Sequence, residues 1–180
     1  MAEPKASPSA AMPRLAAIAL GPLTPIGAGV AIVACLLDQA LKYWLLFVFD
    51  IGAKGTVVLA PVLDLVLVWN SGISYGLLQQ TTATGRWILL GVKAVAVILL
   101  WGWLARTRSK LAAVSLGLII GGALGNAIDR LSYGAVVDFV LFHIFGFNWY
   151  VFNLADAAIV AGVGGLLYES LRTESAAKAP

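Results

Sequence analysis

The sequence predicts a mainly α-helical membrane protein: a bundle of four transmembrane helices with a small extramembrane β-sheet and an apolar external loop. Three observations predict this fold class. Of the 180 residues, 61% are hydrophobic and only 12% are charged, and the mean hydropathy of +0.92 lies far above that of soluble domains. The apolar residues gather in four long stretches, and most of the cations lie between or beyond them on one predicted side of the membrane.

Each of the four stretches is long enough to cross a hydrocarbon core of about 30 Å as an α-helix. They cover residues 25–49, 87–104, 111–128 and 153–171. One small bundle accounts for all four, so we expect a single domain over residues 23–171.

The distribution of charge predicts the orientation of the bundle. Cytoplasmic loops of membrane proteins carry an excess of lysine and arginine. The cations that flank the spans on one side are Lys5, Arg14, Arg106, Arg108, Lys110, Arg172 and Lys178. Both termini are therefore predicted to be cytoplasmic, and residues 50–86 and 129–152 to face outward. A nucleic-acid partner is not expected, because these cations lie in short tails and one tight loop.

Residues 1–22 and 172–180 are predicted to be disordered cytoplasmic tails, because they are polar or rich in Ala, Ser and Pro. A cleaved signal peptide is an alternative for the N-terminus, since IVAC at 32–35 is similar to a lipoprotein cleavage box. The chain stays apolar from Cys35 to Phe49, however, where a cleaved lipoprotein would continue as a polar tether. An uncleaved first span is therefore favoured.

The two external segments are unusually apolar. VVLAPVLDLVLVWNSGISYG, at 57–76, is dense in Val, Leu and Trp and is interrupted by Gly, Pro and Asn, which favours strands over another helix. In the second segment Trp149 and Tyr150 suit the membrane interface. Both segments are therefore expected to contact membrane lipid or a lipid-like ligand.

The chain has one cysteine and one histidine, which excludes several kinds of disulfide, metal and catalytic site. With one cysteine, Cys35, the chain can form neither an internal disulfide nor a thiolate metal cage. The single His143 removes any histidine cluster, and no GxSxG motif accompanies it. We expect no metal and no cofactor, and a serine nucleophile is a poor candidate.

Ionisable residues inside a membrane span are costly and are candidates for function. Asp38 and Lys42 in DQALK lie four residues apart on one helical face, so a structural ion pair is the favoured explanation. Lys93 has no partner nearby in sequence. It lies about two turns from the outer end of its span, where a lysine can extend to the interface, and we assign it no catalytic role.

An Asn-x-x-Asp spacing occurs twice at the outer ends of spans, and it places an amide and a carboxylate on one helical face. Asn153 and Asp156 are explained equally well as a helix N-cap and its N3 residue. Asn126 and Asp129 lie at a helix C-terminus, where capping cannot explain a negative charge. Neutralisation by Arg130 would make Asp129 a structural brace.

Asp138 and Asp156 remain as carboxylates without a cation nearby in sequence. If the second external segment folds back over the outer surface, the two can approach each other and share one proton. Such a pair activates water as aspartic proteases do. Three alternatives stay open: two solvated carboxylates, a non-enzymatic transporter or scaffold with structural Asp and Asn groups, and a different dyad of Asp129 with Asp156.

Several motifs of the chain resemble those of the lipoprotein signal peptidases, or signal peptidase II. They are DQALK (38–42), WNSGISYG (69–76), GGALGNAIDR (121–130), VVDF (136–139) and FNLAD (152–156). They occur in order over most of the chain, and the combination of the last three is highly specific. The first external segment departs from the family pattern by carrying Tyr75 where phenylalanine is common, which concerns only fine substrate contacts.

The resemblance implies an aspartyl endopeptidase of the bacterial inner membrane, with its site near the periplasmic face. It would cut diacylglyceryl-modified prolipoproteins immediately before the lipidated lipobox cysteine, and globomycin-type cyclic peptides would inhibit it. The motifs place the catalytic dyad on Asp138 and Asp156. By the same resemblance, the supporting or substrate-binding residues are Asn70, Asn126, Asp129, Arg130, Asn153, Asp38 and Lys42.

Overall fold

A computed structural model describes residues 20–72 and 83–178 of the chain. Most of the predicted tail 1–22 lies outside the described residues. The same holds for residues 73–82, which include Tyr75 and form part of the predicted external segment 50–86.

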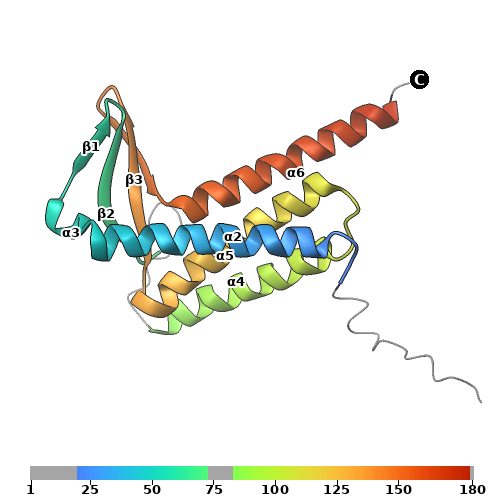
Figure 1. Ribbon diagram of the computed structural model, residues 1–180, viewed down its shortest axis with the longest axis horizontal. Coiled ribbons are helices and arrows are strands. Elements are labelled where there is room, and N and C mark those ends of the chain that lie inside the picture. Colours follow the sequence, from blue (N-terminus) through green and yellow to red (C-terminus); the bar gives the residue numbers. More distant parts are fainter. Residues whose placement is uncertain (1–19, 73–82, 179–180) are drawn as a thin grey trace, which may run out of the picture.

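Four helices in the described part of the chain are long and apolar enough to cross a membrane, which confirms the predicted bundle. Figure 1 shows them running alongside one another with the sheet at one end. They are α2 (Thr24–Tyr43), which continues as the π-helix η1 (Trp44–Val48), α4 (Ala83–Leu104), α5 (Lys110–Tyr133) and α6 (Leu154–Lys178). Helix α5 is the central element, because it packs against each of the other three.

Glycines allow α5 to approach its neighbours closely. A Cβ atom at Gly121 would collide with the backbone of Ala31 on α2, and one at Gly122 would collide with the carbonyl oxygen of Ala155 on α6. Small residues at helix crossings are typical of membrane bundles, where close backbone packing replaces the hydrophobic effect. This packing brings the polar residues of the three helices into one cluster.

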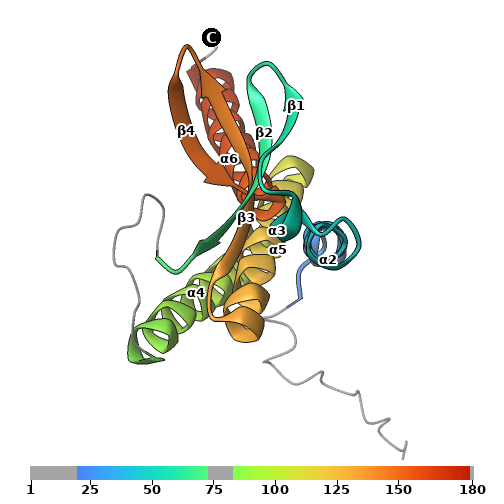
Figure 2. The ribbon, with the colours of Figure 1, turned by 90° about the vertical axis from the view of Figure 1, so that its left-hand side faces the viewer.

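The external segments form one antiparallel sheet in the order β1-β2-β3-β4, seen in Figure 2. The first segment contributes α3 (Ile51–Lys54), β1 (Val57–Ala60) and β2 (Leu63–Asn70), so the strands predicted there are confirmed. The second contributes β3 (Val136–Ile144) and β4 (Phe147–Phe152), for which the sequence alone gave no strand prediction.

Two helices extend beyond their predicted ends. Helix α5 reaches Tyr133 and stops at Gly134, whose φ of 79° suits glycine in a left-handed C-cap; Asp129 therefore lies within the helix. Helix α6 reaches Lys178, so the predicted disorder of residues 172–180 is wrong as far as the structure describes them. The segment is rich in Ala, Glu and Lys, which propagate an existing helix readily.

The start of β3 is buried on both faces and joins the sheet to the bundle. Val137 and Phe139 pack with Leu45 and Ile51 in an apolar core at the end of the first span. Successive side chains of a strand point to opposite faces, so Asp138 points away from this core, into the polar cluster of the bundle.

Candidate active site

Asp138 is held by two amides from separate elements. Asn70 Nδ2, at the end of β2, donates to Asp138 Oδ2 at 2.9 Å, and Asn153 Nδ2 donates to Oδ1 at 2.6 Å. The side chain is only 1% exposed. Burial raises the pKa of Asp138 to about 6, and the nearby charge of Asp156 adds to the rise, although both hydrogen bonds oppose it.

Asp156 lies in the first turn of α6 and is only partly buried. It forms a reciprocal cap with Asn153: the Asp156 backbone N–H donates to Asn153 Oδ1 at 2.9 Å, and the Asn153 N–H donates to Asp156 Oδ2 at 3.4 Å. The predicted N-cap is thereby confirmed. The cap does not exclude a functional role, because the same carboxylate also faces the centre of the bundle.

Asn153 and Asn126 connect the two carboxylates. Asn126 Nδ2 donates to Asp156 Oδ1 at 2.8 Å, while its carbonyl oxygen accepts from Asn153 Nδ2 at 3.0 Å. Asn153 itself contacts Asp138 through its side chain and Asp156 through its backbone. Asn153 therefore links the two acids by hydrogen bonds, although Asp138 lies on a strand and Asp156 on a helix.

Beneath these amides lies a buried ionic cluster. Lys42 Nζ contacts Asp38 Oδ2 at 2.8 Å, which confirms the predicted ion pair, and Asp129 Oδ2 at 2.6 Å. It also donates to Asn126 Oδ1 at 3.3 Å. The proposed neutralisation of Asp129 by Arg130 is wrong as an ion pair, because among the described residues the cation in salt-bridge contact with Asp129 is Lys42.

Both oxygens of Asp129 accept hydrogen bonds from neighbouring elements. Its Oδ2 also accepts from the Val137 N–H at 3.1 Å, and its Oδ1 accepts from Gln39 Nε2 at 2.8 Å. Asp38 similarly accepts from the Ala155 N–H at 2.9 Å. These contacts fix the starts of β3 and α6, and therefore position Asp138 and Asp156.

Arg130 and Asn70 hold the segment that follows β2. The guanidinium of Arg130 donates to the Gly72 carbonyl oxygen, and Asn70 Oδ1 accepts from the Gly72 N–H at 3.0 Å. Asn70 Nδ2 also donates to Tyr150 OH at 2.8 Å, which ties β2 to β4. The sheet is thus joined to α5 at the edge of the polar cluster.

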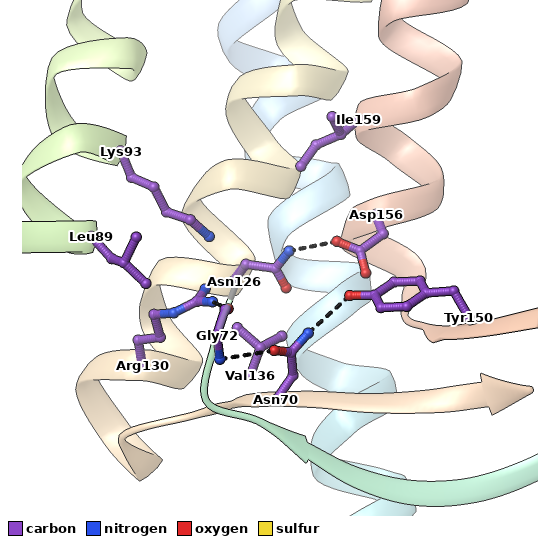
Figure 3. Close-up of a pocket in the computed structure, with 10 residues that line it drawn as sticks. All are labelled: Asn70, Gly72, Leu89, Lys93, Asn126, Arg130, Val136, Tyr150, Asp156 and Ile159. Carbon is purple, nitrogen blue, oxygen red and sulfur yellow. Dashed lines mark hydrogen bonds between the residues drawn. The ribbon is translucent and has the colours of Figure 1, made fainter. Parts of the chain in front are cut away.

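A cavity of about 200 Å³ opens beside Asp156, as shown in Figure 3. Asn70, which donates to Asp138, lines this cavity as well. Its walls come from the sheet and from α4, α5 and α6. The lining residues are Asn70, Gly72, Leu89, Lys93, Asn126, Arg130, Val136, Tyr150, Asp156 and Ile159. A larger apolar groove of about 680 Å³ runs along β4 and α6 and shares Tyr150, Asp156 and Ile159 with it. Space beside Asp156 therefore continues into an apolar surface.

Three residues of this region were not predicted from the sequence to take part in it. Gln39 braces Asp129, and Tyr150 contacts Asn70, although we expected Tyr150 only at the membrane interface. Lys93, which we assigned no role, lines the cavity. Gln39 lies inside DQALK and could have been included with its neighbours. No local signal identifies the other two, because their positions depend on how distant elements meet.

Comparisons with known proteins agree with this architecture. The family model for signal peptidase (SPase) II matches residues 30–172. The lipoprotein signal peptidase of Nitrobacter hamburgensis is 58% identical over 88% of this chain and 100% of that protein, and that of Rhodopseudomonas palustris strain CGA009 is 57% identical over the same shares. A bacterial membrane enzyme solved by the in meso method at 2.3 Å resolution is similar with a TM-score of 0.70 and 27% identity, over 87% of this chain and 93% of that one.

The match of the family model covers most of the chain, and the relatives are similar over their full length. The four apolar helices agree with a protein that crosses the membrane several times. The chain therefore belongs to the signal peptidase II family, and it is a multi-pass membrane protease of bacteria.

Proposed function

We propose that this protein is a lipoprotein signal peptidase that uses Asp138 and Asp156 as an aspartyl dyad. Its substrates are diacylglyceryl-modified prolipoproteins, which it cuts immediately before the lipidated cysteine. The observation that carries the proposal is the convergence of the two acids on Asn153, beside a cavity and with the pKa of Asp138 raised to about 6. Two carboxyl groups with different proton affinities can divide the roles of acid and base.

The different environments of the acids support an assignment of roles. Buried Asp138 holds a proton and donates a hydrogen bond to the oxygen of the scissile carbonyl. Asp156, which lines the cavity, acts as the base and removes a proton from the attacking water. The resulting tetrahedral intermediate breaks when the nitrogen of the lipidated cysteine takes up a proton from the dyad and leaves as an amine.

The surroundings of the dyad suit a substrate anchored in the bilayer. The acids lie where the sheet meets the helix ends, and positive-inside bias supports a periplasmic location for this end. The apolar groove along β4 and α6 leads to Asp156 and can hold an apolar part of the substrate next to the scissile bond. Globomycin-type cyclic peptides would inhibit the enzyme by occupying the cavity beside the dyad.

The structure favours Asp138 over Asp129 as the partner of Asp156. Asp129 is 0% exposed, and both of its oxygens accept from Lys42, Gln39 or the Val137 N–H. Asp138 is buried as well, but it accepts from the neutral amides of Asn70 and Asn153 and its pKa is raised, which suits it to hold the proton that the acid partner of Asp156 needs. A transporter or scaffold is set aside by membership of a peptidase family.

Lipid dependence provides the test of this function. The purified enzyme in phospholipid vesicles is given a diacylglyceryl-modified lipobox prolipoprotein and its unlipidated twin, and the products are mapped by mass spectrometry. We expect cleavage of the lipidated substrate alone, with the new N-terminus at the lipidated cysteine. Equal cleavage of both substrates, or a cut elsewhere, would contradict the proposal.

A further inference from the structure

Lys93 is a cation within a membrane span, and it lines the cavity beside Asp156. It lies ten residues into α4, so its Cα is about 15 Å below the start of that helix. Figure 3 shows the side chain extending from α4 into the cavity toward Asn126. Figure 3 shows Lys93 and Ile159 on the side of the cavity away from the sheet, and Asn70, Gly72 and Val136 on the side of the sheet. Because the sheet lies at the end of the spans, the side of Lys93 is the one nearer the membrane core.

The ammonium group of Lys93 forms no hydrogen bond or ion pair with any residue in the described ranges. Lys42, the other lysine of the region, is committed to two carboxylates and an amide. Asp156 is the acid that shares the cavity with Lys93, but its oxygens already accept from Asn126 and Asn153. Three N–H donors therefore point into the cavity, and a charge at this depth needs a polar partner.

The proposed substrate has acceptors at the matching depth. A signal helix inserted with its N-terminus in the cytoplasm ends close to the cleavage site, and its residues before the cut lie on the membrane-core side. The last four carbonyl groups of any helix lack N–H partners within the helix, and such groups are costly to leave unpaired in lipid. The same helix end carries partial negative charge, which favours a cation.

We propose that Lys93 is a substrate-binding residue that caps the carbonyl end of the signal helix just upstream of the cut. This inference rests on the proposed function, because it needs a substrate whose helix enters from the bilayer. Lys93 acts on carbonyls that do not react, so its contact is the same in the ground state and the transition state. Its loss then raises KM and leaves kcat nearly unchanged.

The test uses the full-length enzyme in vesicles with Lys93→Met, Lys93→Arg and wild type. On a lipidated full-length prolipoprotein, we expect Lys93→Met to raise KM about ten- to a hundredfold, the range of a charge-assisted hydrogen bond. Lys93→Arg, which keeps the charge and the donors, restores most of the loss. Lys110→Met removes a lysine at the opposite end of the bundle and should leave KM unchanged. Thermal unfolding checks that each variant is folded.

A second substrate tests whether Lys93 binds a carbonyl group of the signal helix or one of the diacylglyceryl ester. A lipidated peptide that begins four residues before the cysteine has no signal helix, and wild type and Lys93→Met should cleave it equally well. An equal defect on both substrates would assign the contact to the diacylglyceryl ester and overturn the inference. A fall in kcat alone, or an unchanged KM in Lys93→Met, would also overturn the inference. In either case, cleavage of the lipidated substrate by the wild-type enzyme would still support the proposed function.

Discussion

At the scale of single residues, the site depends on how each carboxylate is surrounded. Asp138 is buried and accepts from two neutral amides, whereas Asp129 is buried beside a lysine. Burial without a directly bound cation favours the protonated form of a carboxyl, in agreement with the raised pKa of Asp138. The different surroundings of Asp129, Asp138 and Asp156 therefore suit them to serve as brace, acid and base, respectively.

The raised pKa of Asp138 predicts a pH dependence. If the active enzyme needs a proton on Asp138, kcat/KM has a descending limb near pH 6, because the free enzyme loses this proton as the pH rises. The hydrogen bond from Asn70 stabilises the ionised form, so Asn70→Ala raises the pKa further. We expect the limb to move to higher pH by about one unit.

The measurement is kcat/KM of wild type and Asn70→Ala across the pH range. Asn148→Ala, which removes an exposed amide from the same sheet, is the control and should keep the wild-type limb. A limb that stays in place or moves to lower pH in Asn70→Ala would show that Asp138 does not set it.

At the scale of elements, the interactions within one helix could be predicted from the sequence, and those between elements could not. The Asp38–Lys42 pair and the Asn153–Asp156 cap depend on spacings of four and three residues along the helix. The contact of Lys42 with Asp129 depends instead on the crossing of α2 and α5. The bond from Asn70 to Asp138 depends on the register of β2 and β3, which local patterning did not fix.

The crossing of α5 and α6 predicts a sharp difference between two glycines. A methyl group at Gly122 would collide with the carbonyl oxygen of Ala155, whereas one at Gly164 would meet nothing within 4 Å. Gly122→Ala should therefore separate the helices next to Asp156. Gly164→Ala should be neutral or stabilising, by up to about 1 kcal/mol, because alanine favours the helix.

Thermal unfolding in detergent and prolipoprotein cleavage measure this pair of variants. We expect a lower Tm and a large loss of activity for Gly122→Ala only. Equal Tm values for the two variants would contradict the close packing of α5 and α6.

At the scale of the whole molecule, the sequence predicted the class of fold, and it named most of the residues that the structure brings together in the polar cluster. Hydropathy identified the four spans because lipid leaves few other structures for long apolar segments. The strands from the second external segment were missed, because its continuous apolar and aromatic pattern also suits a loop lying on the membrane. Lys93 was missed for a related reason: its place on the cavity wall exists only after α4 packs beside α5.

Asp138 comes from the sheet and Asp156 from the bundle, so both parts of the fold are needed to bring the two acids to Asn153. The most direct test of this central claim is prolipoprotein cleavage by Asp138→Asn and Asp156→Asn in vesicles. Asp64→Asn, which changes a carboxylate paired with His143 elsewhere on the sheet, is the matched control. We predict that both dyad variants fold and insert normally but lose at least about a thousandfold in kcat, while the control keeps its activity. Near-normal cleavage by either dyad variant would contradict the account.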